Sequence, residues 1–164
     1  MKRILFPALC LIITSCSHTY YIVRHAEKIK PAAGSAIAVT NDPTLSETGK
    51  MRAEKLKEIL IDKKIKHIFS TNTIRTLTTA KPLSDAIGIQ TVLYNPKKDS
   101  AFTEHLKRLK KNALIVGHSN TIDDVVNRLF NKICIPADIP DSVYDNLFIV
   151  KYHGKKISFK QKKY

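Results

Sequence analysis

Residues 20–28 read Tyr20-Tyr21-Ile22-Val23-Arg24-His25-Ala26-Glu27-Lys28. Apolar and β-branched residues run up to Arg24-His25 and stop there, a pattern typical of a buried strand that delivers a cation and an imidazole at its carboxyl end. A second run has the same design and reads Ala113-Leu114-Ile115-Val116-Gly117-His118. We therefore expect two buried strands whose carboxyl ends bring His25 and His118 together.

Helix and strand patterns alternate through the rest of the chain. Apolar residues recur at helical spacing after Ser46, a good N-cap residue, and again after His118. The predicted helices begin near Ser46 and near Arg75 and cover residues 101–111 and 122–130; the further predicted strands cover residues 67–71, 89–94, 144–152 and 157–159. The lysine-rich residues 160–164 are predicted to be a solvated tail. This alternation predicts the α/β class, with a three-layer α/β/α sandwich and a mostly parallel central sheet.

Ligands of such folds bind beyond the carboxyl ends of the strands. Arg24, His25 and His118 are expected at such ends, and Arg75 just past another one, at the start of a helix. Four groups suited to anion chemistry therefore fall on one edge of the predicted sheet. Residues 31–44, rich in Pro, Ala, Gly, Ser, Asn and Asp, directly follow this first strand, and we expect the long loop to cover the site.

These groups meet the needs of phosphoryl transfer. Neutral imidazole can attack phosphorus at neutral pH, because its unperturbed pKa is about 6.5. Guanidinium groups can hold two phosphoryl oxygens at once, so Arg24 and Arg75 are candidates for cradling the group. Backbone N–H groups at the helix starts after Ser70 and His118 would add positive potential. We therefore predict phosphoryl transfer through His25.

The same residues resemble the histidine phosphatase superfamily, also called phosphoglycerate mutase-like. The resemblance spans roughly residues 20–150 and rests on Arg24-His25-Ala26-Glu27, Leu45-Ser46-Glu47-Thr48-Gly49, the segment from Ser70 to Arg75-Thr76, and Val116-Gly117-His118, in this order. It implies that His25 is the nucleophile that becomes phosphohistidine, and that Arg24, Arg75 and His118 bind the phosphoryl group. It also implies that neither a metal nor an organic cofactor is required. The chain lacks the long insertion of a typical mutase and looks more like the small phosphohistidine and phosphosugar phosphatases of the superfamily.

The resemblance leaves open which group donates a proton to the leaving group. Many acid-phosphatase members have an acidic residue directly after the second histidine, where this chain has Ser119-Asn120. Three carboxyl groups remain as candidates: Glu27, which is two residues from His25, and Asp99 and Glu104, which follow the third predicted strand. For a good leaving group, a water molecule would also serve.

The N-terminus has the plan of an export signal. Lys2-Arg3 is a short basic region, and residues 4–13 are almost entirely apolar but too few to span a bilayer, which takes about 20 residues. Ile13-Thr14-Ser15-Cys16 then resembles the bacterial lipoprotein box. We therefore predict that residues 1–15 are a signal peptide that is removed and that residues 16–164 form a single domain. Lipidated Cys16 would anchor the exported protein to a bacterial membrane, on its periplasmic or surface side.

The chain of 164 residues carries a formal net charge of +14, which becomes +12 without Lys2 and Arg3. This balance favours anionic partners, and a small phosphorylated substrate is the expected one. Nucleic acid is not expected, because the aromatic residues are too dispersed to form base-stacking platforms. Two alternatives stay open: a catalytically weak or inactive phosphate-binding lipoprotein of the same fold, and a basic structural lipoprotein that holds anionic polymers or lipid headgroups.

Overall fold

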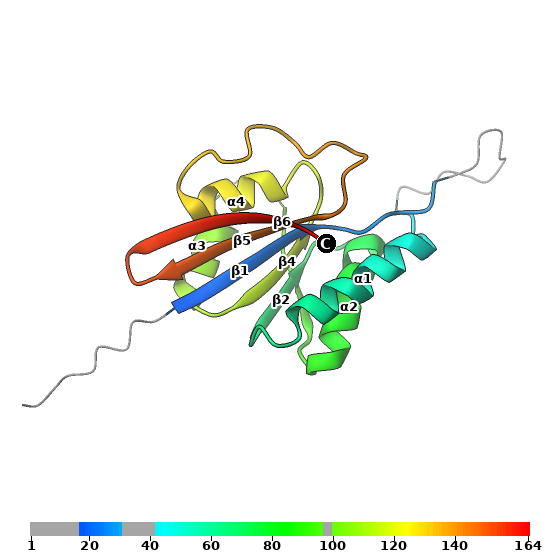
Figure 1. Cartoon of the computed structure of the whole chain (residues 1–164), viewed down its shortest axis with the longest axis horizontal. Coiled ribbons are helices and arrows are strands. Elements are labelled where there is room, and N and C mark those ends of the chain that lie inside the picture. The colour runs from blue at the N-terminus through cyan, green and yellow to red at the C-terminus, as the bar shows by residue number, and fades with distance from the viewer. Residues whose placement is uncertain (1–16, 31–41, 97–99) are drawn as a thin grey trace, which may run out of the picture.

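The computed structural model describes residues 17–30, 42–96 and 100–164 of the chain. Six strands form one sheet in the order β3-β2-β4-β1-β5-β6, and helices pack on both of its faces (Figure 1). In chain order the elements are β1 (Ser17–Arg24), α1 (Glu47–Leu60), β2 (His67–Ser70), α2 (Ile74–Ile87), β3 (Thr91–Leu93), α3 (Ala101–Leu109), β4 (Ala113–Gly117), α4 (Ile122–Phe130), β5 (Asn146–His153) and β6 (Lys156–Lys163). The predicted α/β sandwich is confirmed.

Strands β1 to β4 run parallel to one another. β4 lies between β1 and β2, with Arg24 opposite Gly117 on one side and Ser70 opposite Val116 on the other. β3 pairs with the outer side of β2, while β5 and β6 are antiparallel strands added beside β1. The sheet is therefore mostly parallel, as predicted, and the carboxyl ends of β1 to β4 share one edge.

Alternate side chains of the strands feed two separate hydrophobic cores, because successive residues of a strand point to opposite faces of the sheet. On one face, Ile22 of β1 belongs to a cluster with Leu106 of α3 and with residues of α4. On the other face, Val23 belongs to a cluster with Leu56 of α1 and with residues of α2. Each such side chain contributes about 1.5–3 kcal/mol by leaving water. The two cores together hold β1 and β4 in the middle of the molecule.

The C-terminal hairpin corrects one prediction. β5 and β6 pair along their whole length, and Gly154, with φ of +58°, makes the turn between them, close to the predicted position. Residues 160–163 belong to β6 and Tyr164 is buried, so the prediction of a solvated tail is wrong. The prediction rested on the lysines of this segment. Their side chains are indeed exposed to solvent, but their backbone forms the edge strand β6. Charged residues suit this place because they discourage an exposed strand edge from pairing with another chain.

The start of α1 explains the Leu-Ser-x-x-Gly pattern. The predicted N-cap Ser46 is confirmed, since its Oγ accepts a hydrogen bond of 3.1 Å from the N–H of Gly49. A Cβ on Gly49 would lie 2.1 Å from the main-chain oxygen of Glu27, which no side chain could tolerate. The main-chain N–H of Ser46 donates to the same oxygen at 2.9 Å. Gly49 thus allows α1 to pack directly on the segment that follows His25.

Some predicted features lie outside the described residues: the leader with Cys16, residues 31–41 of the long loop, and Asp99. Residues 42–44, the rest of that loop, lead to Leu45 and the N-cap Ser46 of α1. Within the ranges that the structure describes, no helix is long and apolar enough to cross a bilayer.

Candidate active site

The carboxyl edge of the sheet brings the two histidines together, as predicted. His25 and His118 each follow directly on the last residue of their strand, and the main-chain N–H of His25 donates to the oxygen of Gly117 at 2.9 Å. The centres of the two imidazole rings are 5.6 Å apart. Arg24 and Arg75 lie at the same edge, so all four candidates for anion chemistry meet there.

The orientation of His25 is set by its neighbours in the chain. Its Nδ1 lies 2.8 Å from the carbonyl oxygen of Ala26, which can only accept, so Nδ1 carries the proton of the neutral ring and Nε2 keeps its lone pair. The N–H of Ala26 in turn donates to Thr79 Oγ1 at 2.9 Å, and Thr79 donates to the carbonyl oxygen of Arg75 at 2.7 Å. The segment after β1 is therefore tied to α2.

The surroundings of His25 keep it neutral. Burial lowers the pKa of the imidazole, and although the bond to Ala26 opposes this, the nearby charges of Arg24 and Arg75 lower the pKa further, to about 4. His25 is 3% exposed. At neutral pH the Nε2 lone pair is therefore available for attack on an electrophile.

His118 is held by a chain of threonine hydroxyls that sequence patterns did not single out. Arg75 Nη2 lies 3.4 Å from Nδ1 of His118, which leaves Nε2–H to donate to Thr71 Oγ1 at 2.9 Å. Thr71 then donates to Thr76 Oγ1 at 3.1 Å, and Thr76 donates to the main-chain oxygen of Thr71 at 2.8 Å. Burial lowers the pKa of His118, and Arg75 and Arg24 bring it to about 4, although Asp42 opposes them. His118 is thus also neutral, and its proton lies on Nε2.

Arg24 is buried and held in place by the loop between α4 and β5. Its Nη1 donates to the carbonyl oxygens of Pro140 at 2.9 Å and Val143 at 3.1 Å, and its Nη2 donates to Asp141 at 2.8 Å. The guanidinium carbon lies 4.2 Å from the centre of the Tyr144 ring. This fixed position is what bidentate recognition of a planar or tetrahedral anion requires.

Asp42 is the acidic group at the site that sequence patterns missed. Its Oδ1 accepts from Nη1 of Arg75 at 3.0 Å, and its Oδ2 accepts from the N–H of Ile74 at 2.8 Å. That N–H belongs to the first turn of α2, whose N-cap residue, Thr73, makes no capping bond with its side chain. The carboxylate of Asp42 therefore sits where a helix N-terminus and an arginine favour an anion.

Both site arginines have binding capacity left. The Nε–H groups of Arg24 and Arg75 are buried and have no hydrogen-bond partner among the residues that the structure describes. A buried donor without an acceptor costs about 1–3 kcal/mol. An anion that accepts from either group is therefore stabilised at this edge. Within the same ranges of the chain, no cluster of three or more His, Cys, Asp or Glu side chains is suited to hold a metal ion.

Two of the predicted proton donors are engaged elsewhere, and the third, Asp99, lies outside the described residues. Both oxygens of Glu27 accept hydrogen bonds of 2.7–2.9 Å from Arg52. Burial raises the pKa of Glu27, but the bonds from Arg52 outweigh burial and lower the pKa overall. Glu104 pairs with Lys107 on the surface of α3 at 3.0 Å. The contacts of Glu27 and Glu104 therefore do not link either carboxyl group to the two histidines.

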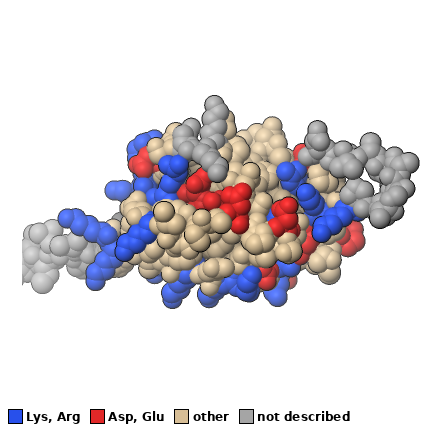
Figure 2. All heavy atoms as spheres, turned by 90° about the horizontal axis from the view of Figure 1, so that it is seen from above, with Lys and Arg blue, Asp and Glu red and all other residues tan. Residues whose placement is uncertain are grey.

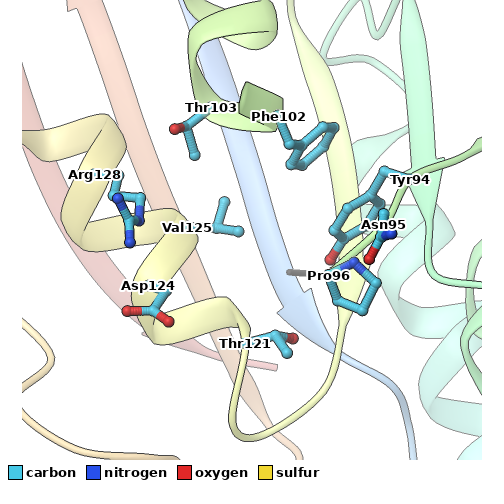
Figure 3. Close-up of a pocket in the computed structure, with 9 residues that line it drawn as sticks. All are labelled: Tyr94, Asn95, Pro96, Phe102, Thr103, Thr121, Asp124, Val125 and Arg128. Atoms are coloured by element: carbon cyan, nitrogen blue, oxygen red, sulfur yellow. The ribbon is translucent and has the colours of Figure 1, made fainter. Parts of the chain in front are cut away.

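A small pocket lies between the segment after β3 and the helices α3 and α4 (Figure 3). Tyr94 lines it on one side and Thr121 on another, and Thr121 Oγ1 accepts from the N–H of His118 at 3.0 Å. A Cβ on Gly117 would lie 2.6 Å from the Tyr94 hydroxyl. Gly117 thus allows the pocket wall to pack against the end of β4, and this packing supports the loop that carries His118.

Comparison with known proteins shows the family of the chain. A family model for the histidine phosphatase superfamily (branch 1) matches residues 20–105, more than half of the chain. No match was found among curated protein sequences.

Several solved structures share the fold at low sequence identity. SixA from Agrobacterium tumefaciens gives a TM-score of 0.62 at 19% identity, covering 89% of this chain and 97% of that chain. The protein histidine phosphatase SixA in complex with tungstate gives 0.66 at 16% identity, covering 88% and 96%. A mycobacterial glucosyl-3-phosphoglycerate phosphatase gives 0.62 at 13% identity, covering 90% and 98%. At these identities the likeness shows the fold.

The lowered pKa values can be tested by NMR of histidine ring nitrogens. We expect His25 and His118 to stay neutral in the folded chain down to about pH 5, because both pKa values lie near 4. In the urea-unfolded chain all histidines should titrate near pH 6.5. The unfolded state then takes up protons that the folded state does not, so the free energy of unfolding should fall as the pH drops from about 6.5 to 4. Titration of either ring near 6.5 in the folded chain would contradict the described burial.

Asp42 can be tested with Asp42→Asn. The amide keeps only one of the two acceptor oxygens and no longer competes as a charge, so phosphate or vanadate should bind about tenfold tighter, the value of roughly one charge-assisted hydrogen bond. Calorimetric titration measures the dissociation constants. The matched control is Asp85→Asn, which removes an exposed carboxylate that pairs with Lys81 on α2. It should leave the dissociation constant of the anion unchanged. Weaker anion binding in the Asp42 variant would show that this carboxylate supports the site instead.

Proposed function

The chain belongs to the histidine phosphatase superfamily, branch 1, and on this premise we propose that it is a phosphatase whose His25 takes up the phosphoryl group of its substrate. One observation carries the proposal. His25 is neutral and its Nε2 is left unprotonated by the bond from Nδ1 to Ala26, at an edge shared with Arg24, Arg75 and His118. A buried neutral nucleophile surrounded by cations suits an anionic electrophile.

The first step forms a bond between Nε2 of His25 and phosphorus, while the bond from phosphorus to the leaving group breaks and its electron pair goes to that group. In the second step water attacks phosphorus and the P–N bond breaks. Its electron pair returns to Nε2, and inorganic phosphate leaves with both protons of the water. His25 ends each cycle neutral, with its proton still on Nδ1.

The other groups at the edge have complementary roles in this proposal. The free Nε–H groups of Arg24 and Arg75 are suited to hold phosphoryl oxygens. The N–H of Ile74 in the first turn of α2, which donates to Asp42, would add to this cradle once the carboxylate is displaced. Loss of one such preorganised donor typically costs about 10²–10³ in rate. A phosphoryl dianion beside His118 would favour its cationic form and so gain a further donor.

The described carboxylates near the site suggest which leaving groups are favoured. Glu27, Asp42 and Asp141 each accept hydrogen bonds from an arginine. Before substrate binds, none of them is presented to a leaving group as a free acid. We propose that the leaving group of the substrate needs little protonation. Substrates of this kind are aryl phosphates and phosphohistidine, which is a phosphoramidate. The fold shared with the protein histidine phosphatase SixA is consistent with the second.

We also propose that the protein acts outside the cytoplasm, anchored through acyl chains on Cys16. The support is the order of basic residues, apolar residues and the Ile13-Thr14-Ser15-Cys16 box in the sequence. Metabolic labelling with a tritiated fatty acid, with Cys16→Ser as the unlabelled control, would test this part separately from the chemistry.

The catalytic proposal is tested by turnover of His25→Ala. With p-nitrophenyl phosphate, loss of the nucleophile should lower kcat by about a thousandfold or more. The matched control is His153→Ala, which replaces an exposed histidine at the turn of the β5–β6 hairpin and should leave turnover unchanged. The wild type should hydrolyse aryl phosphates much faster than glycerol phosphate. Unchanged turnover in His25→Ala would overturn the mechanism, and phosphate binding without any turnover by the wild type would favour the inactive binding protein.

A further inference from the structure

Three turns at the end of the sheet opposite the histidines are strongly basic. They connect α1 to β2 (residues 61–66), α3 to β4 (residues 110–112) and β5 to β6 (residues 153–156), and their only acidic residue is Asp62. Their lysines are all exposed: Lys63, Lys64, Lys66, Lys110, Lys111, Lys155 and Lys156. We call these seven residues the lysine edge.

The sheet places the three turns side by side. Ala113 pairs with both His67 and Tyr20, so β2, β4 and β1 begin at the same edge, and Ser17 pairs with His153 at the hairpin turn. Figure 1 shows this end, where β1 starts beside the hairpin, and Figure 2 shows Lys and Arg side chains gathered there. The lysine edge is therefore one surface of the folded molecule.

Asn112 joins two of the turns to β1. Its side-chain Oδ1 accepts from the N–H of Thr19 at 2.8 Å, and its Nδ2 donates to the oxygen of Lys63 at 2.8 Å. Its main-chain oxygen accepts from the N–H of Lys66 at 2.9 Å. The backbone that carries these lysines is thus fixed, although their side chains reach into solvent.

Among the described residues, positive charge is concentrated away from the histidines. At the carboxyl edge, the described loops, strand ends and first turn of α2 hold as many cations as acids: Arg24, Lys28, Lys30, Arg75 and Lys163 against Glu27, Asp42, Asp138, Asp141 and Asp145. The three turns that carry the lysine edge hold seven lysines and one acidic residue, Asp62. Attraction of phosphorylated substrates to the histidines does not explain this distribution.

Two of the lysines occupy backbone positions that favour glycine. Lys64 has φ of +52° and Lys110, the C-cap of α3, has φ of +48°. This left-handed region is strained for residues with a Cβ, and glycine is the usual residue at such helix ends. The dipole of α3 accounts for a cation at Lys110, but not for lysines throughout three turns. Lysine is therefore present at this edge even at two positions where the backbone conformation favours glycine.

We propose that the lysine edge binds the anionic lipid headgroups of a membrane. Lysine clusters near a membrane are attracted to its negative surface potential. The three turns contain no Phe, Tyr or Trp, so they lack the stacking platforms of a nucleic-acid site. β1 begins here at Ser17, one residue after Cys16, so a lipid anchor on Cys16 and the lysine edge would act on the same membrane.

With the lysine edge on the membrane, the histidines lie at the far end of β1. β1 has eight residues and rises about 3.3 Å per residue, so His25 lies roughly 25 Å from the lipid headgroups. The carboxyl edge then faces away from the membrane, where soluble substrates can reach it.

The test uses the full chain with Cys16→Ser, so that acyl chains do not contribute. It should bind vesicles of phosphatidylcholine mixed with phosphatidylglycerol more tightly than phosphatidylcholine alone, and added salt should remove the difference. Each lysine lost from the edge should weaken this binding about fivefold. Lys64→Gly with Lys110→Gly should therefore weaken it about 25-fold without loss of stability, because glycine suits both backbone positions.

The matched control is Lys160→Ala with Lys162→Ala, which removes the same charge from exposed positions further along β6. Lys160 is four residues from Lys156, or about 13 Å, which exceeds the Debye length of about 8 Å at physiological salt. The control should bind vesicles like its parent, and all variants should keep aryl phosphatase turnover. Equal losses in both double variants would show an effect of net charge alone and overturn the proposal. Absence of any preference for phosphatidylglycerol, or binding of single-stranded DNA in its place, would overturn it as well.

Discussion

The parallel pairing of β1 with β4 sets Arg24 opposite Gly117, and the N–H of His25 donates to the oxygen of Gly117 at 2.9 Å. A slip of one residue would turn every side chain of β1 to the other face and separate the two histidines. Both cores oppose such a slip, because Ile22 and Val23 each fill a different one. The strand pairing therefore determines how far apart the imidazoles lie, and the loops after β1 and β4 determine how the rings are oriented.

Electrostatics then sets the protonation state of these two histidines. Burial and two arginines make the protonated form of either ring costly, while hydrogen bonds from the rings to a carbonyl oxygen and a hydroxyl decide where the single proton lies. The arginines are in turn restrained, Arg24 by the loop before β5 and Arg75 by Asp42. In the proposed reaction, an incoming phosphoryl group would replace the Asp42 carboxylate and would meet donors that need little rearrangement, which is the main requirement of electrostatic catalysis.

The sequence patterns predicted most of the fold and the four groups at its edge. The strands that end at Arg24-His25 and Gly117-His118 are recognisable because their patterns are local. The rule that ligands bind at the carboxyl ends of parallel strands then predicts that these groups lie together. Asp42 was missed because its partner, Arg75, is distant in sequence and no local pattern joins the two. The hydroxyl chain from Thr71 was missed because buried threonines have no distinctive spacing. The paired state of Glu27 with Arg52, the strand at residues 156–163 and the common edge of the lysines likewise depend on tertiary contacts.

The central claim, that His25 and not His118 receives the phosphoryl group, is tested most directly by trapping the intermediate. The full chain would be mixed with an excess of p-nitrophenyl phosphate and quenched within milliseconds in alkali, where phosphohistidine survives, and the phosphate would be located by peptide mass spectrometry. We expect phosphate on the peptide that contains His25, attached at Nε2 as shown by its ³¹P NMR shift, since Nδ1 is occupied by its bond to Ala26. Phosphate on His118, or turnover with no phosphorylated histidine at any quench time, would contradict the mechanism.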